Sequence, residues 1–151
     1  MTDKQSVVEI QVAEMFTGLV PVERLERAVV TTLRHEERPG EVTVVVTDDQ
    51  GIRELNRDFM DEDEATDVLS FPSQEDGGPF IAAPGSDDYL GDVVISYTRA
   101  VDQALEQQYP VERELDLLVV HGVLHLLGYD HADIEERNEM WARQDEILAM
   151  L

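Results

Sequence analysis

The sequence Leu115-Asp-Leu-Leu-Val-Val-His121-Gly-Val-Leu-His125-Leu-Leu-Gly128-Tyr-Asp-His131 is the stretch that decides the fold. Its first half is almost wholly apolar, which predicts a helix from Val111 to about Leu127 that is buried on all sides. His121 and His125 are four residues apart, so they lie on one face of that helix. Gly128 can adopt the left-handed conformation that ends helices, and the chain can then bring His131 back to the same place.

These three histidines are a candidate metal site. One buried histidine is usually hydrogen-bonded and nothing more, but three in eleven residues favour a ligand set, because neutral imidazole is the commonest protein ligand for transition metals. Three nitrogen ligands with one open position are typical of a catalytic zinc site. We therefore predict one zinc ion per chain, held by His121, His125 and His131. Such an ion lowers the pKa of its bound water to about 7 and polarises phosphoryl oxygens, which indicates a hydrolase.

A metallopeptidase is one alternative. The peptidase version of this helix is His-Glu-x-x-His, in which the glutamate is the general base. Here the second position is Gly122, so a peptidase would need its base from elsewhere in the chain.

Length and composition predict one metal-dependent hydrolase domain over residues 1–151. Hydrophobic residues make up 42% of the chain, enough for a core, and no apolar run is long enough to span a membrane. The N-terminal residues do not resemble a signal peptide. The chain has no cysteine, which excludes disulfides and thiolate metal sites. We therefore expect a cytoplasmic protein without membrane contact, and no pattern indicates an oligomeric state.

The charge is strongly negative. Aspartate and glutamate number 34 against 11 basic residues, a net charge of −23. A field of this sign repels nucleic acid in general. It is typical of proteins that stay soluble at high salt, so we expect an origin in a salt-rich cytoplasm and a stability that increases with salt.

The remaining periodicity predicts an α+β fold, with a small mixed sheet of about four strands packed against four to five helices, the histidine helix at its centre. Expected strands are 7–12, 41–47, 66–71 and 93–97; expected helices are 21–35, 50–59, 99–108, 111–127 and 132–150. In the last helix, Ile134, Trp141 and Leu148 are expected in the core together with Met140 and Ile147 alongside them, as is Phe59 in the second. Arg24, Arg27 and Arg34 are expected on an outer face, either merely solvated or facing RNA.

The histidine block resembles the signature of the YbeY family of rRNA maturation factors. Three further blocks are similar to that family in order and spacing: Leu55-Asn56 with Phe59, Thr66-Asp-Val-Leu-Ser-Phe-Pro72, and Leu90-Gly-Asp-Val-Val-Ile-Ser96. Together they run from about Leu55 to His131. The resemblance implies an α+β fold with the three histidines at the base of a cleft.

The resemblance also implies a function that spacing alone does not. It implies a zinc-dependent, single-strand-specific endoribonuclease that acts in 16S rRNA 3′-end maturation and in ribosome quality control. The implied partners are single-stranded rRNA, the ribosome or its small subunit, and ribosome-associated proteins. A second alternative is a non-catalytic ribosome-assembly factor that binds RNA or protein and carries a structural zinc.

The chain departs from the family where the RNA is expected to bind. The family usually has an arginine and then a glycine directly after the aromatic at Phe59, whereas this chain has Met60 and Asp61 followed by three acidic residues. Arg53 and Arg57 are the candidate substrate-binding replacements. No general base is identified beyond the metal-bound water, and Asp130 is expected to orient a histidine or to cap the turn.

Overall fold

The fold is described from a computed structural model, in which residues 6–73, 88–130 and 132–151 are placed. Within these residues the chain forms four strands, a short 3-10 helix and five α-helices. Their bounds are β1 Val7–Val12, η1 Glu14–Phe16, α1 Val22–His35, β2 Glu41–Thr47, α2 Asp49–Met60, β3 Val68–Pro72, β4 Tyr89–Ser96, α3 Tyr97–Gln107, α4 Val111–Leu126 and α5 Ile134–Leu148. This confirms the α+β class predicted from the sequence.

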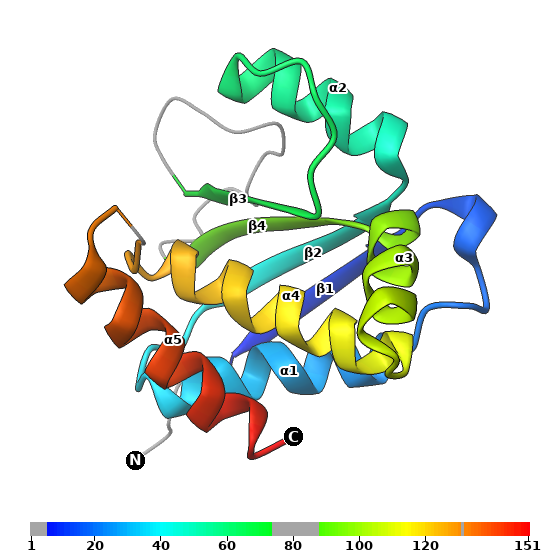
Figure 1. The fold of residues 1–151 in the computed structure, drawn as a ribbon. Coiled ribbons are helices and arrows are strands. Elements are labelled where there is room, and N and C mark those ends of the chain that lie inside the picture. Colours follow the sequence, from blue (N-terminus) through cyan, green and yellow to red (C-terminus); the bar gives the residue numbers. More distant parts are fainter. Residues whose placement is uncertain (1–5, 74–87, 131) are drawn as a thin grey trace.

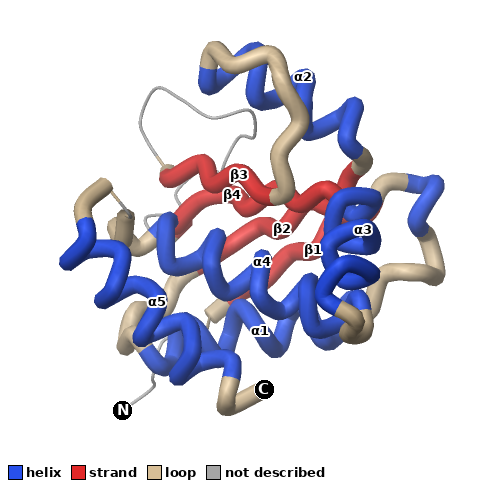
Figure 2. Tube along the Cα trace, in the orientation of Figure 1, coloured by secondary structure: helices blue, strands red, loops and turns tan. Residues whose placement is uncertain are grey.

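The four strands form one mixed sheet in the order β1-β2-β4-β3. Strand β2 pairs in parallel with both β1 and β4, while the edge strand β3 pairs antiparallel with β4. Strand β4 begins at Tyr89, before the predicted start at Val93, because its pairing with β2 extends back to Glu41. Helices α1 and α4 lie on one face of the sheet and α2 lies on the other (Figures 1 and 2).

Helix α4 is the central element of the helical layer. It contacts α1, α3 and α5 as well as strands β3 and β4. Leu115, Val119, Val123 and Leu124 are fully buried, as expected for a helix that is apolar on all sides. They pack with the inward valines of β2 and β4 in the main core. A smaller core on the α2 side of the sheet contains Ile52, Phe71 and Val94.

Two helix ends follow from local sequence. The side chain of Asp48 accepts a hydrogen bond of 2.8 Å from the backbone N–H of Gly51 and caps α2, a position that favours aspartate. At the end of α4, Gly128 has a φ of +105°, and the N–H of Tyr129 donates to the carbonyl of Leu124. This is the glycine-terminated end that the sequence predicts, and it turns the chain directly after His125.

Helix α5 is placed differently from the prediction. Ile134 and Trp141 were expected in the core but are 65% and 49% exposed, whereas Met140 and Ile147 are fully buried. Phe59, also expected in the core, is 48% exposed and meets only the edge of the Phe71 ring, with centroids 6.0 Å apart. Of the stripe expected in the core, the side with Met140 and Ile147 is therefore the one that faces it, and Leu148 packs partly buried against the same core.

The arginines of α1 do not form one outer stripe. Arg24 turns toward α4, and its guanidinium donates to both oxygens of the Asp116 carboxylate, with the shortest N···O distance at 2.8 Å. Arg27 and Arg34 are exposed. None of the helices in the described part of the chain is long and apolar enough to cross a membrane.

Candidate metal centre

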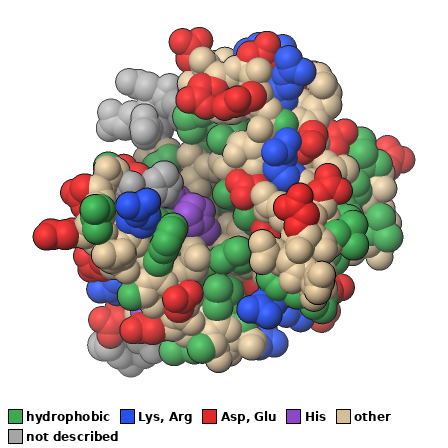
Figure 3. Space-filling model, in the orientation of Figure 1, with side chains coloured by type: hydrophobic (Ala, Val, Ile, Leu, Met, Phe, Trp, Pro, Cys, Tyr) green, Lys and Arg blue, Asp and Glu red, His purple; other side chains and the backbone are tan. Residues whose placement is uncertain are grey.

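Two of the predicted ligands line one pocket. His121 and His125 face a cavity of about 280 Å³ whose other wall is the segment Thr66–Ser70, at the start of β3. The two imidazole rings have centroids 4.7 Å apart and are nearly perpendicular. Figure 3 shows a histidine side chain at the bottom of a hollow in this face of the molecule. The four-residue spacing thus places two imidazole rings at one pocket, and their role as metal ligands stays a prediction.

His121 is held by a residue that sequence reasoning missed. Its Nδ1 lies 3.0 Å from the Oε1 of Gln144 on α5. With the amide oxygen as the acceptor, Nδ1 carries the proton and the lone pair is on Nε2. Metal-binding histidines are usually oriented in this way through their other ring nitrogen. No sequence periodicity points to Gln144, because its role depends on how α5 docks against α4.

The third predicted ligand, His131, lies outside the described residues. Within the described ranges there is no group of three or more His, Cys, Asp or Glu side chains arranged to hold an ion. His121 and His125 fit a metal by their donor chemistry and shared pocket, and the assignment of His131 stays a prediction. Asp130 lies exposed in the turn after α4, and its predicted role also stays untested.

Gly122 lets α4 approach the sheet closely. A Cβ atom at this position would lie 2.5 Å from Cγ1 of Val93 on β4. Across the same contact, the Ser70 hydroxyl donates a hydrogen bond of 2.9 Å to the carbonyl of Gly122. A glutamate here would enter the packed contact with β4 rather than the pocket, so the peptidase general base has no place on this helix.

The predicted substrate-binding arginines are not among the residues that line the histidine pocket. Each also faces a carboxylate: the Nε of Arg53 lies 2.8 Å from Asp63, and that of Arg57 lies 3.1 Å from Asp58. Met60 ends α2 and is 41% exposed. Asp61 follows with a φ of +59°, a left-handed position where the resemblance places glycine and where aspartate is tolerated.

A polar network fastens the turn that follows the histidine helix. The carboxylate of Glu36 at the end of α1 accepts hydrogen bonds from Tyr129 at 2.6 Å and from Arg143 at 3.1 Å. It also lies 2.6 Å from Nδ1 of His35. Burial raises the pKa of Glu36, but the hydrogen bonds from Tyr129, His35 and Arg143 outweigh it and lower the pKa below its ordinary value.

Two buried carboxyl groups with raised pKa values lie outside the histidine pocket. Burial raises the pKa of Asp92 on β4, although the Tyr89 hydroxyl donates to it and partly offsets the effect. Burial likewise raises the pKa of Glu114 on α4, with a hydrogen bond from Tyr109 opposing it. The acid that does line the pocket is Asp67.

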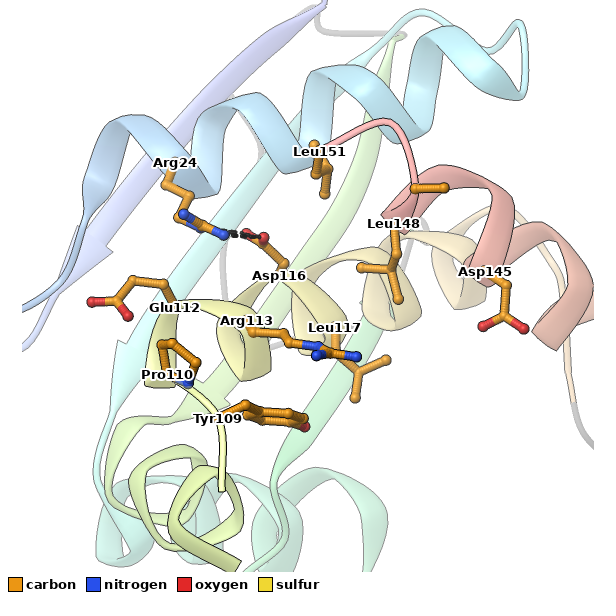
Figure 4. A pocket seen from close by; sticks show the side chains of 11 residues that line it. Arg24, Tyr109, Pro110, Glu112, Arg113, Asp116, Leu117, Asp145, Leu148 and Leu151 are labelled. Carbon is orange, nitrogen blue, oxygen red and sulfur yellow. Dashed lines mark hydrogen bonds and ion pairs between the residues drawn. The ribbon is translucent and has the colours of Figure 1, made fainter. Parts of the chain in front are cut away.

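A larger cavity, of about 810 Å³, lies at the other end of α4 (Figure 4). Its wall includes the Arg24–Asp116 ion pair and the apolar side chains Leu117, Leu148 and Leu151. None of its lining residues is a histidine, and the guanidinium of Arg113 sits 4.8 Å from the ring centroid of Tyr109. The smaller histidine pocket is therefore the better candidate for metal chemistry.

Comparison with known proteins gives concordant matches. The family model described as "Endoribonuclease YbeY" matches residues 3–151. A protein named Endoribonuclease YbeY from Roseiflexus sp. (strain RS-1) is 44% identical over all of this chain and 96% of its own length. Another of that name, from Bacillus cereus (strain G9842), is 44% identical over 91% of this chain and 88% of its own length. The solution structure of TM1509 from Thermotoga maritima matches with a TM-score of 0.64 at 28% identity, over 94% of this chain and 87% of that one.

Proposed function

The chain belongs to the endoribonuclease YbeY family, and we propose that it is a zinc-dependent, single-strand-specific endoribonuclease that matures the 3′ end of 16S rRNA. Its relatives are named as endoribonucleases, which places the chain among the hydrolases. The observation that carries the metal part of the proposal is the pair His121 and His125 at one pocket, with His121 oriented by Gln144.

The proposed zinc ligands are His121, His125 and His131, with one ion per chain. When bound, the ion acts as a Lewis acid toward the scissile phosphodiester. The chain's own residues prepare the site: Gln144 fixes the tautomer of His121, and the Ser70–Gly122 hydrogen bond holds β3 against α4. Strand β3 thereby forms the second wall of the pocket, along which a single strand would lie.

The proposed setting is the cytoplasmic ribosome. The substrate would be single-stranded rRNA of the small subunit, and ribosome-associated proteins would bring the enzyme to it. The proposal includes ribosome quality control, the second role that the family resemblance implies. Support comes from the family match over residues 3–151, since the pocket itself indicates a hydrolytic metal site and not a particular RNA.

Cleavage of a single-stranded RNA is the direct test. We expect the zinc-loaded protein to cleave it, and we expect His125→Ala and a chelated sample to fail. Gln107→Ala is the control, because Gln107 is exposed on α3 and is not among the residues that line the pocket; it should keep both zinc and cleavage. Cleavage that survives chelation and His125→Ala would refute the proposal.

A non-catalytic assembly factor with a structural zinc is the second candidate. The acidic segment after Met60 and the carboxylate-paired Arg53 and Arg57 favour it, since they weaken the contact with RNA expected of the enzyme. Zinc-loaded protein that binds single-stranded RNA or ribosomal subunits without cleaving the RNA would support this candidate. A peptidase has no such support, given the packing at Gly122.

A further inference from the structure

Helix α5 carries an arginine and a tryptophan whose side chains contact each other on its exposed surface. Trp141 is the single tryptophan of the sequence, and it is 49% exposed. The guanidinium of Arg137 lies 5.7 Å from the centroid of the Trp141 ring. We propose that Arg137 and Trp141 contact single-stranded RNA at the rim of the histidine pocket, an inference that rests on the proposed endoribonuclease function.

The position of the pair follows from Gln144. Residues 137, 141 and 144 fall on one side of a helix, since successive residues are about 100° apart. Gln144 contacts His121 at the pocket, so Trp141 lies one turn of α5 away from that contact. Helix α5 folds back along α4 (Figure 1). In Figure 3 a hydrophobic and a basic side chain lie next to the histidine on the α5 side.

Charge distinguishes Arg137 from half of the ten arginines of the chain. Arg24, Arg53, Arg57, Arg99 and Arg143 each face a carboxylate within 4.0 Å. Over the ranges that the structure describes, no ion pair of Arg137 is found, and its guanidinium contacts the indole instead. The positive charge of Arg137 is therefore available to a phosphate.

The indole ring of Trp141 can stack on a base without contributing a positive charge. Base–aromatic stacking does not depend on charge and tolerates any base, which is why single-strand binding proteins use exposed aromatic side chains. Helix α5 also carries Glu135, Glu136 and Glu139, which repel phosphates. The stacking contact of Trp141 should therefore dominate, and the ionic contact of Arg137 should be the smaller and salt-dependent part.

The single tryptophan makes the contact directly observable. Titrating the zinc-free protein, in chelator, with a single-stranded oligoribonucleotide should quench the indole fluorescence, and a duplex of the same sequence should not. Anisotropy of a labelled oligonucleotide then compares variants. Trp141→Ala should raise the dissociation constant by about tenfold, and Trp141→Phe should restore most of the affinity because it keeps a ring.

The salt dependence separates the two residues. Arg137→Gln should weaken binding at low salt and lower the slope of log affinity against log salt by about 0.7, the value for one phosphate contact on a single strand. The loss caused by Trp141→Ala should persist at high salt. Arg113→Gln, an exposed arginine over the Tyr109 ring at the other end of α4, and Leu105→Ala, an exposed apolar residue of α3, are the matched controls and should change neither value.

The outcomes distinguish this contact from the proposed function. Cleavage of RNA with an unchanged dissociation constant in Trp141→Ala would overturn the contact and leave the enzyme intact. Quenching of the indole fluorescence and a tenfold higher dissociation constant for Trp141→Ala, with no cleavage by the zinc-loaded protein, would support the contact and count against the nuclease. Binding that leaves the indole fluorescence unchanged would place the RNA elsewhere and overturn the inference. Absence of RNA binding by both the zinc-free and the zinc-loaded protein would overturn both.

Discussion

At the scale of single residues, Gln144 is expected to set the affinity of the proposed zinc site. Gln144→Ala removes the acceptor for Nδ1 of His121, so the ring loses its fixed tautomer and orientation. Loss of such a partner typically lowers metal affinity by about 10–100-fold. We expect that decrease in a zinc competition titration against a chelator, while Gln144→Glu, which keeps an acceptor, should retain the affinity.

Gln107 on α3 provides the comparison, because it is exposed and lies on another helix. Gln107→Ala should leave zinc affinity unchanged. If Gln144→Ala also bound zinc as tightly as the parent protein, the contact would be incidental to metal binding. Because the measurement is affinity and not cleavage, it reports on the ligand directly.

Gly122 makes a prediction about stability. Gly122→Ala places a Cβ 2.5 Å from Val93 in a buried contact, and overpacking of this kind costs about 1–3 kcal/mol. The cost should exceed the gain in helix propensity, which is about 1 kcal/mol. Urea unfolding should show a lower free energy of unfolding for the variant.

The double variant Gly122→Ala/Val93→Ala tests the stated cause. Removing the valine methyl groups makes room for the new Cβ, so the two changes together should cost less than the sum of each alone. Simple additivity, or a Gly122→Ala protein more stable than its parent, would contradict the close contact between α4 and β4.

At the scale of elements, Glu36 links α1, α5 and the turn at Tyr129. Its pKa is lowered because the hydrogen bonds of Tyr129, His35 and Arg143 outweigh the effect of burial. A lowered pKa in the folded state adds stability above the unfolded-state pKa, and that stability is lost as the pH falls through the folded-state pKa. Glu36→Gln should therefore cost about 1–3 kcal/mol at neutral pH.

The pH dependence supplies the control for this prediction. Protonated glutamate resembles glutamine, so the difference in unfolding free energy between parent and Glu36→Gln should shrink as the pH falls below the ordinary range of glutamate. Denaturant unfolding at several pH values measures this. A difference that stays constant with pH would show that the charge of Glu36 contributes nothing.

The same scale shows what could be predicted from the sequence. Helix α4 and its histidine pair were predictable because the run from Leu115 to Val120 is almost wholly apolar, so burial does not depend on which face docks. Helix α5 was not. The expected stripe combined Ile134, Trp141 and Leu148 with Met140 and Ile147, and only the docking against α4 decides that its Met140 and Ile147 side is the buried one. Gln144 was missed for the same reason.

At the scale of the whole molecule, the ion pairs differ in burial and in the parts of the chain that they join. The ion pairs of Arg24 and Arg143 join separate helices, with Asp116 and Glu36 as nearly buried partners. Those of Arg53 and Arg57 are exposed and local to α2 and the segment after it, and such pairs contribute little to stability. Because 34 acidic residues face only 11 basic ones, most acidic side chains have no compensating cation. Their mutual repulsion destabilises the folded state.

This repulsion predicts that added salt stabilises the protein. At a net charge of −23, the compact state concentrates like charges more than the unfolded chain does, and salt screens them: the Debye length falls from about 10 Å at 0.1 M to about 3 Å at 1 M. We expect the melting temperature to rise in KCl, with 1 kcal/mol corresponding to about 2–4 °C in a chain of this size.

A variant with Glu106, Glu135 and Glu136 all changed to glutamine, which removes exposed acids of α3 and α5, should gain less from the same salt. A melting temperature that does not change with KCl would show that the charge was not selected for salt, and would make screening an inadequate account of how RNA approaches the pocket.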